Sequence, residues 1–419
     1  MLLKILKKLN EKSLAPIVAV GGCVRDLLIG KDPKDIDLLF LGNDIDLEKS
    51  LAGFNYKRIE PTSSFPIFSF KILGMVVEIT IPRKEVKISG KNPHKSFDMI
   101  FSGNFTLEED VLRRDFTVNA IAMDHNGNII DPLNGKADLE KRDLVPCSKA
   151  FIEDPLRVFR ALRFSCKGFR ISNSLIDLIN KNKTELEEEI NKLPMERLRM
   201  EFEKSLISDN FKNFFYNYLV LDLHIENFDF IKEMSKIPAG PKFFHNNDSV
   251  LDHSIKVMEN VKPENRLFAL FHDYGKIFTP SSVLPRHIGH EIIGPEKVEI
   301  LMKKLKFTAK DIKFASIIAG EHMSFGYYNE WKTTTKFKKI SNILKSGCLD
   351  ILIDVVSADN SDFTEKEILE IRKISDFLKL PVSSYIDFEI FDKKSKSFMI
   401  NKIYETKISK IKEIIKNTP

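Results

Sequence analysis

Residues 18–40 constrain the fold of this chain more than any other segment, and they read VAVGGCVRDLLIGKDPKDIDLLF. The apolar run Ile17–Val20 predicts a strand that enters the pair Gly21 and Gly22, and a helix-like stretch follows. Adjacent glycines let the backbone approach a phosphate, whose charge suits free N–H groups. Arg25 adds a forked donor for phosphate oxygens. The segment therefore predicts a phosphate-binding strand–loop–helix unit, and the absence of a GxGxxG pattern disfavours a dinucleotide fold.

Two aspartates lie at a second predicted strand, Ile36–Phe40. Because Asp35 and Asp37 are two residues apart, a strand presents both carboxylates on one face. Such a pair can bridge two Mg²⁺ ions roughly 3.5–4 Å apart, as two-metal phosphoryl transfer requires. A lone GG is usually a turn and a lone DxD pair is usually surface decoration, but their succession on two strands is much rarer. With Glu78 of the strand-like run MVVEITI, the predicted catalytic residues are Asp35, Asp37 and Glu78, and Mg²⁺ is the predicted cofactor.

The pattern of apolar residues changes along the 419 residues. Residues 17–130 alternate strand-like runs, including Phe65–Ile72 and Met75–Ile81, with Gly, Pro, Asn and Asp, which predicts a mixed α/β region. From about residue 153, apolar residues recur at spacings of three and four, which indicates helices. A Pro/Gly break at 238–241 precedes a His-rich helical stretch and a Lys-rich helical end. The sequence therefore predicts an α+β fold with one small sheet followed by all-α modules, and domains at 1–140, 141–240, 241–365 and 366–419.

Charge is nearly balanced except at the C-terminal end. The chain has 65 Lys and Arg against 60 Asp and Glu, a net charge of +5. Residues 390–419 alone hold eight Lys and three acidic residues, so the remainder is neutral. A basic field over the whole protein is excluded, and any polyanion has to be bound by local patches. Apolar residues recur at helical spacing in this tail, at Ile400, Tyr404, Ile408, Ile411 and Ile415. The tail is therefore predicted to be an amphipathic helix whose Lys-rich face either stays in solvent or contacts an RNA backbone.

The cysteines and the N-terminal residues help to predict the cellular compartment of the protein. Four cysteines lie far apart without a CxxC pair, which argues against a disulfide scaffold or a zinc ribbon and fits a reducing cytoplasm. The N-terminal MLLKILKKLNEK carries Lys within its apolar part and predicts a short amphipathic helix rather than a signal peptide. No run of 18 apolar residues occurs, so a membrane span is not expected. We therefore expect a cytoplasmic protein with no membrane partner.

Four further motifs follow the glycine–aspartate segment in order. They are RRDFTVNA at Arg113–Ala120, DPLNGKADLEKR at Asp131–Arg142, EDPLRVFRALRF at Glu153–Phe164 and PMERLRMEFEK at Pro194–Lys204. Together with GGCVRDLLIG and DIDLLF, they resemble the nucleotidyltransferase family that contains class II CCA-adding enzymes and bacterial poly(A) polymerases. The resemblance covers about residues 17–205. It implies that residues 1–140 form a nucleotidyltransferase head and residues 141–240 a helical neck and body that binds the nucleotide base and tRNA.

The resemblance also implies roles for individual residues. RRDFTVNA resembles the family's ribose-binding motif, and EDPLR resembles its base-selecting motif. Asp154 and Arg157 lie three residues apart and share a helix face, so their carboxylate and guanidinium can read the edges of a base without a template. A salt bridge between these two residues is the structural alternative, and Glu153 is a candidate to orient Arg157. The implied nucleotide-binding residues are Gly21, Gly22, Arg25, Arg114, Asp115, Asn119, Asp154, Arg157, Arg160 and Arg163.

A second cluster of polar residues lies farther along, where six of the nine histidines fall within residues 245–322. His272 and Asp273 form an adjacent pair, and with His253 and Asp359 they supply imidazole and carboxylate ligands for a divalent metal. The stretch from HDYGKIFTP through LPRHIGHE resembles the HD phosphohydrolase domain that follows the polymerase part in one group of bacterial CCA-adding enzymes. The resemblance implies hydrolysis of 2′,3′-cyclic phosphates or 2′-nucleotides, with Mg²⁺, Mn²⁺ or Ni²⁺ bound by these four residues.

Additional residues of this region have several possible roles. His287 and His290 are candidate extra ligands or phosphate binders, with Arg286 and Lys276 nearby in sequence. The plainer alternative is an inactive HD fold whose histidines are satisfied in the core.

The combined expectation is an enzyme that adds C, C and A to the 3′ end of tRNA from CTP and ATP and releases pyrophosphate. Poly(A) polymerases of the same fold usually carry a Gly-Arg-Arg-Phe-type segment after the DxD strand, and the corresponding IEPTSSFPIFSF lacks it. Enzymes that add only CC or only A are further alternatives. A non-enzymatic RNA-binding protein, or an HD hydrolase with an inert head, is disfavoured because Asp35, Asp37 and Arg157 are all present.

Overall fold

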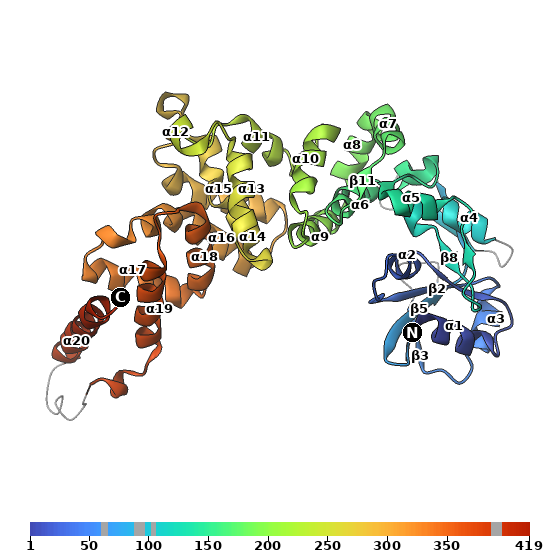
Figure 1. Cartoon of the computed structure of the whole chain (residues 1–419), viewed down its shortest axis with the longest axis horizontal. Coiled ribbons are helices and arrows are strands. Elements are labelled where there is room, and N and C mark those ends of the chain that lie inside the picture. The colour runs from blue at the N-terminus through green and yellow to red at the C-terminus, as the bar shows by residue number, and fades with distance from the viewer. Residues whose placement is uncertain (60–65, 88–96, 102–105, 387–395) are drawn as a thin grey trace. The chain divides into compact units, whose positions relative to one another are not determined.

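The computed structural model describes residues 1–59, 66–87, 97–101, 106–386 and 396–419 (Figure 1). The chain forms two compact units, each with its own core. The first comprises Met1–Ser205 and Asp209–Ile225, and the second comprises Leu206–Ser208 and Glu226–Pro419. These units are coarser than the four domains predicted from the sequence, whose boundaries stay predictions.

A seven-stranded mixed sheet lies in the first unit. Its strands, in spatial order, are β3 (Tyr56–Ile59), β4 (Ile67–Ile72), β5 (Met75–Thr80), β2 (Ile36–Phe40), β1 (Ile17–Val20), β8 (Ala122–Met123) and β9 (Ile129–Ile130). Strand β2 is antiparallel to β1 and parallel to β5, so the aspartate-bearing strand lies inside the sheet. Two smaller pairs complete the strands, β6 (Arg83–Lys87) with β7 (Phe97–Phe101) and β10 (Asp143–Leu144) with β11 (Arg170–Ile171).

The helices of the first unit begin with the predicted N-terminal helix, which buries Leu2, Ile5, Leu6 and Leu9 along one side. Fully buried phenylalanines pack the later helices of this unit against one another. The ring of Phe214 lies 5.1 Å from that of Phe202 and 6.0 Å from that of Phe159. The helices are α1 (Leu2–Asn10), α2 (Gly22–Leu28), α3 (Asp44–Ser50), α4 (Leu107–Leu112), α5 (Gly135–Lys141), α6 (Leu156–Ser165), α7 (Asn173–Lys181), α8 (Lys183–Asn191), α9 (Met195–Leu206) and α10 (Lys212–Leu221).

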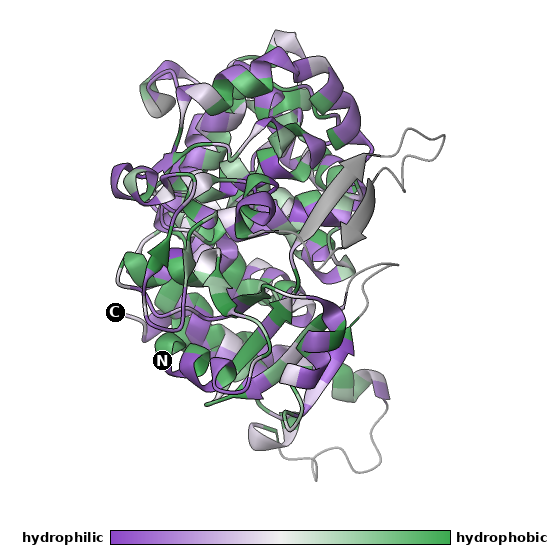
Figure 2. Ribbon diagram, turned by 90° about the vertical axis from the view of Figure 1, so that its right-hand side faces the viewer, coloured by the Kyte–Doolittle hydropathy of each residue, from purple (hydrophilic) through white to green (hydrophobic). Residues whose placement is uncertain are grey.

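The second unit is helical throughout its described residues. Many helices of the chain carry both hydrophobic and hydrophilic residues along their length, as expected of helices that each bury one face (Figure 2). Capping boxes at Ser249 and Thr364 fix where α13 and α19 begin. The helices are α11 (Phe230–Lys236), α12 (Lys242–His245), α13 (Val250–Asn260), α14 (Arg266–Phe271), α15 (His290–Lys304), α16 (Ala309–Gly326), α17 (Thr333–Ser346), α18 (Leu349–Asp359), α19 (Glu365–Lys379) and α20 (Lys396–Lys416).

Most of the predicted elements are present. Strands β1 and β2 have the predicted bounds, and β4 and β5 lie within the predicted runs, although Phe65 is outside the described residues. The two-residue strands β8 and β9 were not predicted because they are too short to show a periodic pattern. All four cysteines are buried and free of disulfides. Across the described ranges, no helix combines the length and the apolarity that crossing a bilayer needs.

The predicted tail helix exists as α20, and its C-terminal half is the more deeply buried, although the ring of Tyr404 lies 5.5 Å from that of Phe337. Ile411 is completely buried, whereas Ile400 is 55% exposed and Tyr404 is 37% exposed. The helix packs against α17 and α19 of the same unit. The segment 387–395, which includes the first residues of the predicted Lys-rich tail, lies outside the described residues.

The core of the second unit can be tested at Phe271. Its side chain is fully buried, with its ring 5.5 Å from that of Phe230 and 5.9 Å from that of Tyr274. We expect Phe271→Ala to lower the free energy of unfolding by about 3–5 kcal/mol through lost burial and a residual cavity. Urea denaturation followed by the fluorescence of Trp331, the single tryptophan, reports on this unit.

The matched control for this substitution is Ile292→Ala on α15, since the Ile292 side chain is 78% exposed. Its effect should stay within about 0.5 kcal/mol. Equal losses for the two variants would contradict the described core.

Candidate functional site

Three carboxylates share one face of the sheet. Asp37 lies in β2 and is paired in register with Glu78 of the parallel strand β5. Asp35 directly precedes β2, two positions before Asp37. Side chains two residues apart in a strand, or opposite each other in neighbouring strands, point to the same face. The structure therefore brings the three predicted catalytic carboxylates together, and all three are exposed to solvent.

The negative charges of these carboxylates perturb one another. Loss of hydration raises the pKa of Asp37, Arg114 opposes this shift, and the charge of Asp35 adds to it. Loss of hydration also raises the pKa of Glu78, and the charges of Asp37 and Asp35 raise it further. A divalent cation would relieve this repulsion, and carboxylate oxygens are the ligands that Mg²⁺ prefers. The residues present therefore fit the expected Mg²⁺.

Buried Asp115 is the centre of a network that joins four predicted nucleotide-binding residues. Its carboxylate accepts hydrogen bonds from Arg160 Nε at 2.8 Å and Nη2 at 2.6 Å, from Asn119 Nδ2 at 2.9 Å and from the Phe116 N–H at 2.9 Å. Asn119 Oδ1 in turn accepts a hydrogen bond from Arg25. Burial alone would raise the pKa of Asp115, but Arg160 and Asn119 together lower it. The network thus ties the glycine loop, the RRDFTVNA segment and α6 together.

Asp110, which the sequence reasoning missed, fixes both arginines of the RRD segment. This fully buried residue of α4 accepts from Arg113 Nη2 at 2.6 Å and from Arg114 Nη2 at 3.0 Å, on opposite carboxylate oxygens. Arg114 then lies against the glycine loop, where a Cβ on Gly21 would be 2.9 Å from Arg114 Nη1. The φ of +77° at Gly21 favours glycine there, and an added Cβ would also require the Arg114 guanidinium to shift. The signal in the sequence is the spacing, since Asp110 precedes the arginines by three and four residues of a helix.

Arg157 is buried and anchored to backbone carbonyls. Its Nη1 donates to the carbonyl of Ala150 at 2.6 Å, and its Nη2 donates to the carbonyl of Arg113 at 2.5 Å. Asp154 makes a different contact, because its Oδ1 accepts from the N–H of Leu156 at 3.2 Å. Asp154 and Arg157 are therefore each held by at least one backbone group. Asp154 is half-buried and Arg157 is buried at the start of α6.

Positive charge gathers around the ring of Phe164. The guanidinium carbons of Arg163 and Arg25 lie 4.6 Å and 5.1 Å from the ring centroid, and Lys167 Nζ lies 5.3 Å from it. Loss of hydration, together with the charges of Arg163 and Arg25, lowers the pKa of Lys167 to about 8. Glu201 of α9 forms an ion pair with Arg163, which links α6 to the PMERLRMEFEK segment. Arg25 and Arg163 are buried and paired with Asp26 and Glu201, so this cluster mainly holds the helices together.

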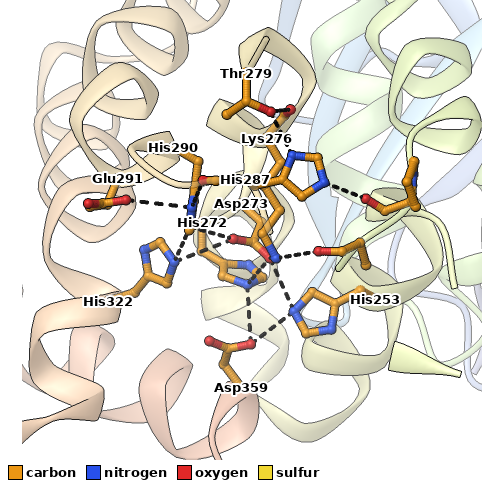
Figure 3. Close-up of polar contacts among 12 residues, drawn as sticks. His253, His272, Asp273, Lys276, Thr279, His287, His290, Glu291, His322 and Asp359 are labelled. Carbon is orange, nitrogen blue, oxygen red and sulfur yellow. Dashed lines mark hydrogen bonds and ion pairs between the residues drawn. The ribbon is translucent and has the colours of Figure 1, made fainter. Parts of the chain in front are cut away.

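The second unit brings a separate set of side chains together (Figure 3). Helices that are distant in sequence position them: His253 lies on α13, His272 and Asp273 directly follow α14, and Asp359 ends α18. His253 Nε2 lies 2.9 Å from Asp359 Oδ1 and 3.2 Å from Asp273 Oδ2. His272 Nε2 lies 3.4 Å and 3.3 Å from the same two oxygens. The structure therefore gathers all four residues predicted to bind the HD metal.

Two more histidines face this cluster, and a third does not. His290 Nε2 lies 3.1 Å and His322 Nε2 lies 3.4 Å from Asp273 Oδ1. His290 was a candidate extra ligand, whereas His322 was missed because a lone histidine on an apolar helix gives no distinct signal. His287, the other candidate, makes 2.7 Å hydrogen bonds through its ring nitrogens with the Thr279 hydroxyl and the Pro238 carbonyl. It is thus bound outside the cluster, as Figure 3 shows.

The charges of the cluster are strongly coupled. Burial alone would raise the pKa of Asp273, but Lys276, whose Nζ lies 2.6 Å away, and His272 lower it well below its usual value. Burial alone would lower the pKa of His272, but Asp273 and Asp359 raise it to about 10. His272 Nε2 is buried and forms no aligned hydrogen bond with any described residue. Mixed imidazole and carboxylate ligands with an unsatisfied ring nitrogen fit a divalent transition metal.

A cavity of about 640 Å³ opens onto this cluster. Its wall includes the cluster residues His253, Asp273 and Asp359, and it also includes Lys276 and Arg286. Cationic side chains beside a metal-type ligand set suit an anionic substrate such as a phosphate ester.

Comparison with known proteins identifies the family. Residues 17–145 match the family described as the poly A polymerase head domain. The chain is 31% identical to the multifunctional CCA protein of Haemophilus influenzae strain PittGG, over 96% of its own length and 99% of that protein. The chain belongs to the multifunctional CCA protein family. Another member, from Pseudoalteromonas atlantica, is 35% identical over 69% of this chain and 71% of that protein.

The fold of this multifunctional CCA family member also matches solved structures. The CCA-adding enzyme of Thermotoga maritima, solved in complex with a tRNA, superposes with a TM-score of 0.64 at 20% sequence identity. The superposition covers 100% of this chain and 94% of that one. The predicted fold class, a head containing a sheet followed by helices, is therefore confirmed.

The repulsion among the three carboxylates leads to a stability prediction for Asp37→Asn. Because the folded-state pKa of Asp37 is raised, its ionisation destabilises the metal-free protein progressively as the pH rises through that pKa. Asp37→Asn should therefore raise the melting temperature at neutral pH in chelator and lose this advantage at acidic pH. Mg²⁺ should stabilise the first unit of the unmodified chain more than that of the variant, by about 2.7 kcal/mol at 100 times its Kd.

Differential scanning fluorimetry across pH, with and without Mg²⁺, measures both effects. Glu108→Gln on α4 is the control, because Glu108 is an exposed acidic residue of the same unit. A lower melting temperature for Asp37→Asn in chelator would contradict the described charge cluster.

Proposed function

We propose that this chain adds C, C and A to the 3′ end of tRNA, using CTP and ATP and releasing pyrophosphate. The observation that carries the proposal is the shared face of Asp35, Asp37 and Glu78, with Arg114 close enough to lower the pKa of Asp37. The identity with multifunctional CCA proteins supports tRNA as the substrate. The partners that follow are tRNA, CTP, ATP and Mg²⁺.

The residues of the first unit have distinct proposed roles in nucleotidyl transfer. Asp35, Asp37 and Glu78 would hold Mg²⁺, which supplies positive charge that lowers the pKa of the RNA 3′-hydroxyl and neutralises the triphosphate. Arg25 and Arg114 bind phosphate oxygens through their forked donors. The 3′-oxygen loses its proton to solvent and bonds to the α-phosphorus in line as the bond to pyrophosphate breaks. Positioning and charge neutralisation account for most of the catalysis.

Choice of the incoming base without a template requires protein groups in place of a pairing strand. We assign this role to Asp154, which accepts hydrogen bonds, and Arg157, which donates them. The carbonyls of Ala150 and Arg113 orient the Arg157 guanidinium. Arg113 therefore orients Arg157 through its backbone carbonyl, while Asp110 binds the side chain of the same Arg113.

The remaining polymerase alternatives differ in their products. A poly(A) polymerase extends many RNAs with repeated A, and a partial enzyme adds only CC or only A. The head family carries the name of poly(A) polymerase, so that match does not separate them. Identity to multifunctional CCA proteins over 96% of the chain favours complete CCA addition.

The metal-binding role of the aspartates can be tested with labelled nucleotides. We expect Asp35→Asn and Asp37→Asn each to reduce incorporation of labelled CTP and ATP into tRNA lacking CCA by on the order of 10³-fold or more, because preorganised charge at the reacting phosphate is lost. Both variants should remain folded and bind tRNA. Asp44→Asn, in α3 of the same unit, should retain full activity. Substantial turnover by either variant would reject the assignment.

We further propose that the second unit is a metal-dependent phosphohydrolase acting on 2′,3′-cyclic phosphates or 2′-nucleotides. The supporting observation is that His253, His272 and Asp359 offer ligand atoms within 4.8 Å of one another beside a cavity. A divalent ion bound there would supply a metal-activated water as the nucleophile. Lys276 and Arg286, which line the cavity, would bind the phosphate oxygens.

This activity can be separated from nucleotide addition by His253→Asn. We expect the unmodified chain to hydrolyse 2′,3′-cyclic AMP with Mg²⁺, Mn²⁺ or Ni²⁺, and the variant to lose at least about 100-fold, since even outer partners of metal ligands contribute about 10–100-fold. CCA addition by the variant should be unchanged, which shows that the first unit is intact, and its unfolding followed by Trp331 should show that the second unit is folded. Absence of hydrolysis by the unmodified chain with all three metals would reject the proposal.

A further inference from the structure

We infer that the cavity beside the histidine–aspartate cluster binds the base of a nucleotide against Tyr327, so that the second unit selects nucleotides over other phosphate esters. The inference rests on the proposed hydrolase function and concerns the part of the substrate that lies away from the reacting phosphate. Tyr327 belongs to none of the sequence motifs described above.

Two consecutive tyrosines follow α16 and have different surroundings. Tyr328 is fully buried, its hydroxyl donates to Glu370 at 2.6 Å, and its ring lies 5.4 Å from that of Trp331. Tyr327 is 55% exposed and forms part of the cavity wall. Within the described ranges, the Tyr327 side chain has no hydrogen bond and no ring contact. Buried Tyr328 therefore fixes the backbone, while the ring of Tyr327 stays available to a ligand.

A hydrogen bond holds Tyr327 close to the metal-type ligands. Asn360, which directly follows Asp359, donates from Nδ2 to the carbonyl of Gly326 at 3.2 Å. A Cβ on Gly326 would lie 3.0 Å from the same nitrogen, so the missing side chain at residue 326 helps the two segments to approach. Asp359 and Tyr327 are thus each one residue away from this contact, and both line the cavity.

The spacing along α16 suits the length of a nucleotide. His322 faces Asp273 at the cluster, and Met323 and Tyr327 line the same cavity farther along the chain. A helix rises about 1.5 Å per residue, so the backbone of Tyr327 lies roughly 7.5 Å beyond that of His322. A phosphate at the cluster is separated from its base by a ribose, which spans a gap of this order. The cavity volume of about 640 Å³ leaves room for all three parts.

Tyr327 and Met323 offer the apolar contacts that a base needs. The two residues are four apart and so share a face at the end of the helix. Aromatic rings stack on bases, and loss of one such ring typically weakens binding by about 5–150-fold. A methionine sulfur is polarisable and packs well against a ring. With Lys276 and Arg286 as phosphate-binding groups, the wall offers contacts to both ends of a nucleotide.

Steady-state hydrolysis by the whole chain tests the role of Tyr327. The substrates are 2′,3′-cyclic AMP and methyl β-D-ribofuranoside 2,3-cyclic phosphate, which carries a methoxy group in place of the base. We expect Tyr327→Ala to raise the KM for 2′,3′-cyclic AMP by about 5–150-fold with little change in kcat. The KM for the base-free ester should not change. Tyr327→Phe should behave like the unmodified chain, because stacking needs the ring and not the hydroxyl.

Tyr404→Ala is the matched control, since this partly exposed tyrosine lies on α20, which contributes no described residue to the cavity wall. It should leave both KM values unchanged. An unchanged KM for 2′,3′-cyclic AMP in Tyr327→Ala, or equal rises for the two esters, would overturn the base-binding role and leave the proposed hydrolase standing. If Tyr327→Ala fails to fold, the unmodified chain decides the question: a lower KM for the nucleotide supports the inference, and equal KM values overturn it.

Photolabelling gives an answer that does not depend on hydrolysis. Under ultraviolet light, 8-azidoadenosine 2′-phosphate should label the tryptic peptide 314–332, which contains Met323 and Tyr327. Excess 2′,3′-cyclic AMP should suppress this labelling, whereas the base-free ester at the same concentration should not. Absence of label on this peptide would overturn the inference. Suppressible label without turnover of either ester would reject the proposed hydrolase and leave the base-binding wall standing.

Discussion

The buried carboxylates of Asp110 and Asp115 are the constraint on which the first unit depends. Between them they accept hydrogen bonds from Arg113, Arg114 and Arg160, and Asn119 connects Asp115 to Arg25. Without these acceptors the arginines would repel one another in a region of low hydration. Removing one partner of such a buried pair typically destabilises a protein by about 3–5 kcal/mol, because the other charge is left unpaired. The glycine loop and α6 are therefore held by the same two side chains.

Both units gather side chains of the types that bind metal ions. In the first unit, three carboxylates raise the pKa values of Asp37 and Glu78. In the second, nitrogen lone pairs and a carboxylate oxygen converge on one point beside Asp273. The ligand types differ, since oxygen ligands suit Mg²⁺ and imidazoles suit transition metals. The two proposed functions therefore call for different metals, one at the site proposed to join phosphates and one at the site proposed to hydrolyse them.

The sequence was sufficient to predict a site where the functional residues lie in one strand or one short motif. The spacing of Asp35 and Asp37 on a buried strand predicted both the strand β2 and the shared face, and the order of five motifs predicted the family. It was insufficient where a residue acts through tertiary contacts alone. His322 joins its cluster only because α15 and α16 pack together. Strand β8 pairs with β1 over only two residues, and so short a strand shows no alternating pattern in the sequence. Arg157 was predicted to share its helix face with Asp154, whereas the carbonyls that anchor it come from the preceding segments, at Ala150 and Arg113.

The central claim is that the first unit builds a defined CCA end on tRNA without a template. Sequencing the 3′ ends of tRNA lacking CCA, after incubation with CTP and ATP together and with each alone, tests it most directly. The account predicts CC with CTP alone, CCA with both nucleotides, no extension beyond the A, and no tail on an unstructured RNA. Long A tails on unstructured RNA, or products that stop at CC when both nucleotides are present, would contradict it.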